Sequence, residues 1–162
     1  MMFDEEEVRK TISVLKPDNQ LYECRIIYEG KNPITGYFRG SDTLIWQLKR
    51  QSLVACNVYI TLNHLDDACY SRSQRDTFLG GKNVKSTSDN DVQGYEWLFV
   101  DLDPVRPSGV SASDDELQLA KDLGNKVYLF MKQVGFEAPV TAESGNGVHL
   151  LYRVAIKADD DG

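Results

Sequence analysis

The chain has 162 residues, of which 41% are hydrophobic and 27% charged, as is ordinary for one globular domain or part of a larger one. No apolar run approaches the roughly 20 residues that cross a bilayer. The acidic start also lacks the basic and apolar regions of a secretory signal, so the sequence argues against a membrane partner and favours a cytoplasmic protein.

The net charge of −7 arises at the two ends of the chain. Carboxylates cluster at residues 4–7 and 159–161, and the remainder holds as many basic as acidic residues. A neutral body neither requires nor excludes a nucleic-acid partner. One polar segment is locally basic and is either a solvated loop or a contact for nucleic acid. Its residues are Arg72, Arg75, Lys82 and Lys85.

The three cysteines, Cys24, Cys56 and Cys69, are odd in number and widely spaced. This pattern favours reduced thiols over a disulfide or zinc framework.

The N-terminal part, residues 3–90, is predicted to be an α/β module. Asp4 is placed to cap a helix whose apolar face carries Val8, Ile12 and Leu15, and Ser41 to cap a second helix. A further helix is predicted over residues 65–79. Strands are expected at residues 21–29, 37–39 and 57–63, and a polar loop at 80–94.

The C-terminal part, residues 91–158, gives a clearer pattern, and a polar tail follows at 159–162. A strand is expected over residues 95–103, followed by a helix that opens with the capping box of Ser113 and Glu116 and ends at Gly135. Its apolar stripe is Leu117, Ala120, Gly124, Val127, Met131 and Val134. Two more strands are expected at residues 138–143 and 148–156, joined by the turn sequence SGNG.

The predicted class is therefore α+β: an α/β N-terminal module joined to a βαββ unit. This order matches the first two-thirds of the ferredoxin-like, or RNA-recognition-motif-like, βαββαβ fold. Because the closing helix and strand have no counterpart in the sequence, we expect an unpaired edge or incomplete cover on the side of residues 148–156. Such an edge favours self-association.

Two aspartates follow a buried strand in the sequence WLFVDLDP. Because side chains alternate along a strand, Asp101 and Asp103 share one face, about 7 Å apart from two strand rises. Two carboxylates at that spacing repel each other unless a cation bridges them, and Mg²⁺ commonly takes one or two carboxylates together with substrate phosphates. The competing interpretation is a solvated turn at the strand end.

The second motif is SGNGVHLLYRV, at residues 144–154. Alternation places His149 on the face of the sheet opposite the predicted helices, together with Asp101 and Asp103; this face is called the open face below. A glycine-flanked turn lets backbone N–H groups approach an anion, and His149 adds a further donor. An ordinary hairpin turn is the alternative.

FVDLDPVRP followed by SGNGVHLLYRV resembles the first two motifs of the archaeo-eukaryotic primase superfamily, most closely the primase-polymerases of phages, plasmids and integrated elements. The resemblance implies that Asp101 and Asp103 bind catalytic Mg²⁺ or Mn²⁺. It also implies that the turn and His149 bind the triphosphate of the incoming nucleotide, with Arg106 nearby. The implied nucleotide-binding residues are Ser144, Gly145, Asn146, Gly147, His149 and Arg106, and the implied catalytic residues are Asp101, Asp103 and His149.

The implied activity is template-directed nucleotidyl transfer by a DNA primase or polymerase in replication. Its partners would be nucleoside triphosphates, a single-stranded DNA template and a fused or separate helicase. The family's third motif supplies another acidic residue from a later strand, and this sequence offers no match to it. We therefore expect a fragment that is inactive or very slow alone, from an active parent protein. Two other functions remain open: a non-catalytic nucleic-acid-binding remnant, and a metal-dependent transferase that uses nucleotide sugars through the D-x-D motif.

Overall fold

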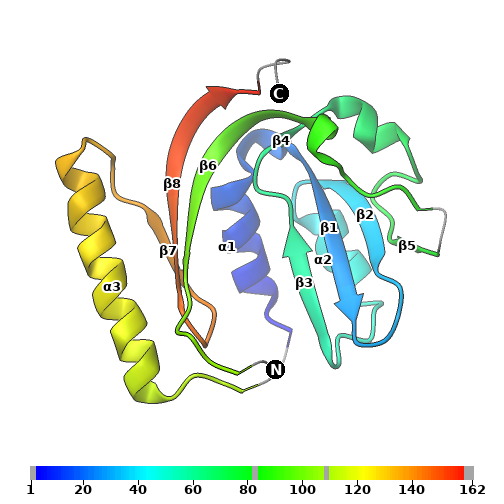
Figure 1. The fold of residues 1–162 in the computed structure, drawn as a ribbon. Helices are drawn as coiled ribbons and strands as arrows, with labels where there is room; N and C mark the ends of the chain where they lie inside the picture. Colours follow the sequence, from blue (N-terminus) through cyan, green and yellow to red (C-terminus); the bar gives the residue numbers. More distant parts are fainter. Residues whose placement is uncertain (1–2, 82–83, 108–109, 159–162) are drawn as a thin grey trace. The chain divides into compact units, whose positions relative to one another are not determined.

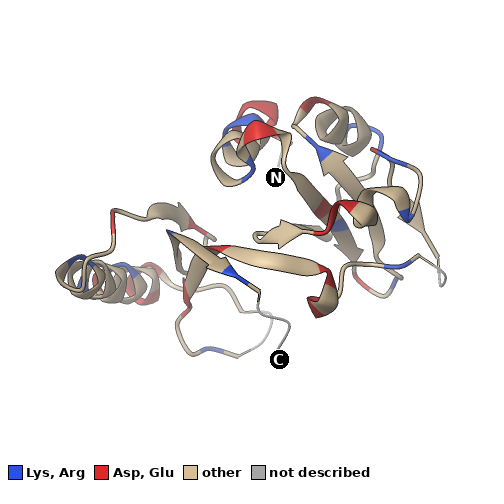
Figure 2. Ribbon diagram, turned by 90° about the horizontal axis from the view of Figure 1, so that it is seen from above, with Lys and Arg blue, Asp and Glu red and all other residues tan. Residues whose placement is uncertain are grey.

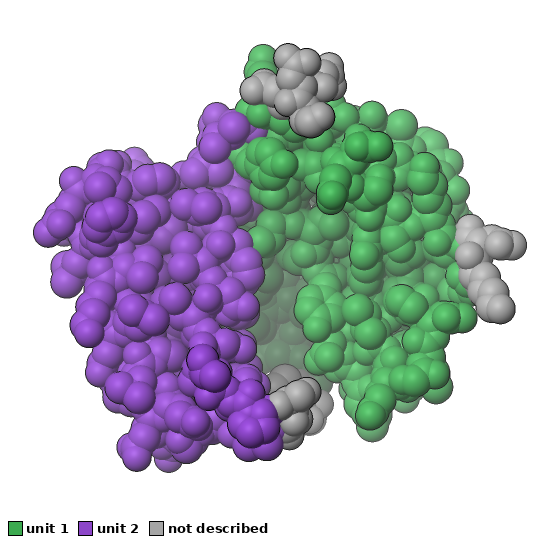
Figure 3. Space-filling view, in the orientation of Figure 1, with its two compact units in different colours: residues 1–95, 157–162 green, residues 96–156 purple. Residues whose placement is uncertain are grey.

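The computed structural model describes residues 3–81, 84–107 and 110–158. The chain divides into two compact units, residues 1–95 with 157–162 and residues 96–156 (Figure 3). The predicted tail at 159–162 lies outside the described residues. The α+β class is confirmed, because helices are combined with antiparallel sheets in the described chain.

The first unit is built on a sheet with strand order β3-β1-β2-β5 (Figure 1). β1 is the central antiparallel partner of both β2 and β3. The helices and strands that begin in this unit are α1 (Glu5–Leu15), β1 (Leu21–Tyr28), β2 (Ile34–Arg39), α2 (Asp42–Leu48), β3 (Cys56–Ile60), β4 (His64–Leu65), β5 (Leu79–Gly80) and β6 (Val92–Leu102). The described residues of this unit also form the 3₁₀ turns η1 (Pro17–Asn19), η2 (Asp67–Ser71) and η3 (Asp89–Asp91).

α1 begins as the sequence predicts. The carboxylate of Asp4 accepts hydrogen bonds from the N–H groups of Glu6 and Glu7, and the acidic first turn complements the helix dipole (Figure 2). The helix buries Ile12 and Leu15. One face of β1 packs against α1 and α2, and the opposite face carries charged residues. The core residues on the helix side include Ile12, Tyr22, Cys24, Ile26, Phe38, Leu44 and Leu48.

The helix predicted over residues 65–79 is wrong. Only η2 forms there, and the segment ends in β5. Asp76 has a φ of +52°, in the left-handed region that interrupts a right-handed helix. Tertiary hydrogen bonds fix this conformation: the Asp76 N–H donates to the Tyr37 carbonyl at 3.0 Å, and the Tyr70 hydroxyl donates to the Asp76 carboxylate at 2.6 Å.

The second unit contains most of β6, then α3 (Asp114–Gln133), β7 (Val140–Glu143) and β8 (Val148–Lys157). The strands β6, β8 and β7 are neighbours in that order. The capping box of Ser113 and Glu116 opens α3, and Gly135 follows its end with a φ of +97°. α3 packs over a core made by Val100, Leu102, Val127, Met131, Phe136, Val148, Leu150 and Tyr152.

One side of this unit is incompletely covered. β7 pairs only with Val148–Leu151, so the remainder of that side of β8 has no strand partner among the described residues. α3 also exposes Leu119, Leu123, Leu129, Phe130 and Val134 to solvent. Val134 belongs to the stripe predicted to face the core, but it lies at the C-cap of the helix and is 55% exposed.

Gly124→Ala is expected to stabilise the chain by about 0.5–1 kcal/mol, because alanine is the better residue inside a helix. A Cβ added at Gly124 would lie 3.5 Å from Val148 and 3.6 Å from Leu102, which is ordinary contact. Urea unfolding measures the change. Gly135→Ala is the comparison: it places a Cβ at positive φ and should destabilise by about 1 kcal/mol. Equal destabilisation by both substitutions would contradict the expected contact between α3 and the sheet.

Candidate active site

β6 positions the first candidate aspartate. Val100 and Leu102 pack into the core beneath α3, so alternation directs Asp101 to the opposite face of the sheet. The Asp101 side chain remains 51% exposed. Asp103 lies just past Leu102, where β6 ends ahead of Pro104. The two aspartates therefore occupy different backbone settings, one within the strand and one after it.

β8 brings His149 to Asp101. The His149 Nε2 lies 3.3 Å from the Asp101 Oδ1, and its ring meets the Phe99 ring edge-on at 5.0 Å between centroids. Farther along, the Arg153 guanidinium lies over the Trp97 ring at 4.8 Å. Because contacts earlier in β6 go to residues later in β8, the two strands run antiparallel. Asp101 and His149 therefore share the open face, as the alternation predicts.

The turn after β7 is held by its own serine. Ser144 Oγ accepts hydrogen bonds from the N–H groups of Gly147, at 3.0 Å, and Asn146, at 3.3 Å. Gly145 has a φ of +82°, which glycine adopts readily. Two of the N–H groups expected to meet a phosphate are thus already engaged within the turn. A bound anion would have to displace Ser144 or use the remaining donors.

Gly147 joins this turn to Asp103. It is buried, and a Cβ added there would overlap the Asp103 Oδ1 and the Leu102 carbonyl oxygen. Only a residue without a side chain permits so close an approach. The end of β6 and the start of β8 are therefore packed against each other at the point where the candidate carboxylate leaves the strand.

The other predicted nucleotide ligands have partners inside the chain. Arg106 Nη2 lies 3.4 Å from Asp103 Oδ2, and Arg106 Nε is buried with no hydrogen-bond partner among the described residues. The Asn146 side-chain oxygen accepts from the Ala112 N–H at 3.0 Å, which ties the turn to the segment before α3. Arg106 therefore stands beside Asp103, whereas the side chain of Asn146 has a structural contact.

The donor set fits a divalent cation in part. Asp101 and Asp103 offer the hard oxygen ligands that Mg²⁺ and Mn²⁺ prefer, and His149 adds one imidazole nitrogen. No group of three such side chains arranged to hold a metal is found within residues 3–81, 84–107 and 110–158. A cation here would depend on further ligands, such as phosphate oxygens or another carboxylate.

The basic segment of the first unit is less available than the sequence suggests. Arg72 makes a two-pronged ion pair with the buried Asp91. Arg75 stacks on the Tyr70 ring at 4.9 Å and is exposed, and Lys85 is exposed as well. Lys82 lies outside the described residues. A nucleic-acid contact through Arg72 would have to break its pair with Asp91.

Sequence reasoning did not predict two contacts that shape this site. Phe99 lies two residues before Asp101 on the same face, so alternation alone could have identified it as a neighbour of His149. The packing of Gly147 on Asp103 depends on the register of two strands, which no local pattern encodes.

No helix in the described part of the chain is long and apolar enough to span a membrane. Comparison with protein-family models, with curated proteins and with solved structures finds no match for this chain.

Proposed function

We propose that this chain is the metal- and nucleotide-binding part of a primase-polymerase that carries out template-directed nucleotidyl transfer. The contact between Asp101 and His149 is the observation that best supports the proposal. It joins on one sheet face the two sequence segments that resemble the first two primase motifs. The packing of Gly147 on Asp103 brings the same two segments together a second time.

In this proposal Asp101 and Asp103 hold Mg²⁺ or Mn²⁺. A bound divalent ion supplies Lewis acidity, which activates a 3′-hydroxyl for attack and stabilises departing pyrophosphate. Asp101 is half exposed and therefore accessible to an ion. Asp103 is 45% exposed and lies beside Arg106, which offsets part of its charge while no cation is bound.

His149 and the turn of residues 144–147 position the triphosphate. The His149 Nε2, near Asp101, is directed to the open face and can donate a hydrogen bond to a phosphate oxygen. The Phe99 ring restricts the imidazole by edge-on contact. Arg106 supplies a nearby cation for the same phosphates. Much of the rate in such chemistry comes from holding the reacting groups in line.

The proposed substrates are nucleoside triphosphates and a single-stranded DNA template, with a helicase as fused or separate partner. The proposed setting is cytoplasmic replication of a phage, plasmid or integrated element. Two of the three expected acidic ligands are present, so binding by this chain should be weak. Primer extension should be absent or at least about 100-fold slower than with a complete site, since misplacing the reacting atoms by about 1 Å lowers the rate by that factor.

Calorimetry with Mn²⁺ and a nucleoside triphosphate tests the proposal. We expect weak triphosphate binding that requires Mn²⁺. Asp101→Asn should lower the Mn²⁺-dependent affinity by more than about tenfold, because even substitution of residues that only support metal ligands lowers metal affinity by about 10 to 100-fold. His149→Ala should weaken the triphosphate more than Mn²⁺. Asp115→Asn, in the exposed first turn of α3, removes the same charge and should leave binding unchanged.

Other outcomes separate the competing functions. Binding of single-stranded DNA in the presence of chelator, with no triphosphate binding, would favour a non-catalytic nucleic-acid-binding protein. Preference for a nucleotide sugar over a triphosphate would favour a transferase. Fast primer extension by the 162-residue chain would show that two carboxylates suffice or that a third comes from within it.

A further inference from the structure

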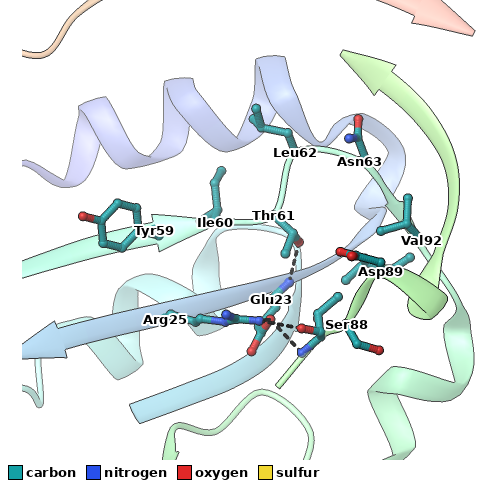
Figure 4. Close-up of a pocket in the computed structure, with 12 residues that line it drawn as sticks. Glu23, Arg25, Tyr59, Ile60, Thr61, Leu62, Asn63, Ser88, Asp89 and Val92 are labelled. Carbon is teal, nitrogen blue, oxygen red and sulfur yellow. Dashed lines mark hydrogen bonds and ion pairs between the residues drawn. The ribbon is translucent and has the colours of Figure 1, made fainter. Parts of the chain in front are cut away.

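The first unit contains a pocket that lies away from its helix-covered core. The pocket has a volume of about 380 Å³, within the range of small-ligand sites (Figure 4). It opens on the face of β1 and β3 that carries Glu23, Arg25, Tyr59 and Thr61, opposite the face packed against α1 and α2. All of its lining residues belong to the first unit, so it is separate from the site at Asp101.

An ion pair between the buried Glu23 and the partly exposed Arg25 lines this pocket. Glu23 is fully buried, and its carboxylate accepts hydrogen bonds from Arg25 Nη2 at 2.7 Å, from the Thr87 N–H at 3.1 Å and from the Thr35 hydroxyl. Burial alone would raise the pKa of Glu23, but the bonds from Arg25, Thr35 and Thr87 outweigh it, and the pKa is lowered. The Arg25 Nη2 also donates to the Thr87 carbonyl at 2.8 Å. The guanidinium is therefore held in one orientation.

Arg25 keeps unused donors. Its side-chain hydrogen bonds to other described residues all come from Nη2, so Nη1 has no acceptor among them, and about 35% of the side chain is exposed. Arginine has five N–H donors, and donors without a protein partner at a partly exposed site can donate to water or to a ligand. A ligand in this pocket is thus expected to present acceptor atoms to Arg25.

The rest of the wall offers complementary groups. Asp89 is exposed, and in the close-up its carboxylate points toward Thr61 (Figure 4). It has no hydrogen-bond or ion-pair partner in the described part of the chain, so it can accept from a ligand. Tyr59 lies opposite Arg25 in the β1–β3 register and is 52% exposed, which provides an aromatic surface for stacking.

We propose that this pocket binds a nucleobase and prefers guanine. Guanine presents O6 and N7 as acceptors for arginine, and its N1–H and N2 amino group as donors for a carboxylate. Adenine and cytosine each offer an amino group to a carboxylate, but fewer of their remaining atoms pair with arginine and carboxylate together. Thymine has no amino group. A planar base can also stack on the exposed Tyr59 ring, since every base stacks on aromatic side chains. The proposal needs neither Asp101 nor Asp103.

The guanine could belong to a free nucleoside or to a single strand, and the experiment separates the two sources. Labelled 12-residue oligothymidylates carrying one central guanine, adenine or cytosine are titrated with the full chain, without triphosphate and in chelator. Fluorescence anisotropy should show at least about tenfold tighter binding for the guanine strand than for thymine alone. Calorimetry with guanosine tests the free nucleoside. Guanosine binding without a guanine preference in the strands would assign the pocket to the free nucleoside.

Two substitutions test the residues, with circular dichroism to verify folding. Asp89→Asn should reduce the guanine preference to less than about twofold. Tyr59→Ala should lower the affinity for every strand, by a factor that is similar from one strand to the next. Asp18→Asn makes the same charge change in the first unit outside the pocket, at a positive φ that asparagine tolerates, and should alter neither. Equal affinity for all strands with no guanosine binding would overturn the proposal. A guanine preference that survives Asp89→Asn would overturn it too. Because chelator removes metal-dependent binding, failure here is distinct from failure at Asp101.

Discussion

Gly147→Ala is expected to lower the free energy of unfolding by about 2–3 kcal/mol, as overpacking in a tight site does. The added methyl group would overlap the Asp103 Oδ1 and the Leu102 carbonyl oxygen. The Leu102 oxygen belongs to the backbone of β6, so it cannot move by a change of rotamer. The turn and the end of β6 must instead separate. Urea unfolding measures the loss of stability.

The same substitution should abolish Mn²⁺-dependent triphosphate binding at temperatures where the variant is still folded, because Asp103 is displaced from the turn. Gly124→Ala is the matched control, since it adds the same methyl group to the same unit at ordinary contact distance. A Gly147→Ala variant with wild-type stability and binding would show that Asp103 and the turn are not packed together.

Arg72→Met is expected to destabilise the chain by about 3 kcal/mol at neutral pH. It leaves Asp91, which is only 5% exposed, without its cation, and breaking a buried pair has effects of 3–5 kcal/mol. Asp91 also accepts from the Ser88 N–H and hydroxyl at the turn that precedes β6. The ion pair therefore fixes the start of the strand that later carries Asp101.

The pH dependence gives this prediction a second readout. The Arg72 guanidinium and the Ser88 N–H hold the pKa of Asp91 well below its ordinary range. A carboxylate with a lowered folded-state pKa stabilises the fold fully above its unfolded pKa, near 3.9, and loses that contribution as pH falls toward the folded value. Wild-type stability should therefore fall below about pH 4, and Arg72→Met should remove that part of the slope.

Arg75→Met is the control for Arg72→Met, because Arg75 is exposed and makes only surface contacts, a stack on Tyr70 and a 3.4 Å hydrogen bond to the Ser71 hydroxyl. It should change stability by less than about 1 kcal/mol. Equal effects of the two substitutions would contradict a specific role for the Arg72–Asp91 pair. An unchanged acid slope in Arg72→Met would assign the slope to other carboxylates, such as Glu23.

Local signals predicted much of the fold. Asp4 and the Ser113–Glu116 capping box fixed two helix starts, and alternation separated the faces of β6 and β8. Residues 65–79 were mispredicted because their conformation depends on partners distant in sequence. Tyr37, for example, accepts from the Asp76 N–H. Such bonds override helical propensity and leave no pattern within the segment itself.

The candidate site divides in the same way. The period of two placed Asp101 and His149 on one face, but their 3.3 Å contact also requires the register between two strands that α3 and β7 separate in sequence. The engagement of Asn146 with Ala112 and of Arg72 with Asp91 depends on tertiary neighbours. The pocket at Glu23 was missed for a related reason. From the sequence alone, a carboxylate in an apolar strand is expected to face solvent, and its burial follows only from its partners Thr35 and Thr87.

The alternation along β6 also bears on how this chain can change length during evolution. Deleting or inserting one residue between Trp97 and Asp101 would exchange the two faces of the strand, burying the carboxylate beneath α3 and exposing Val100 and Leu102. Length changes in the β1–β2 connection, residues 29–33, would alter no face. Homologous sequences should therefore align without gaps across β6 and accumulate them in that connection.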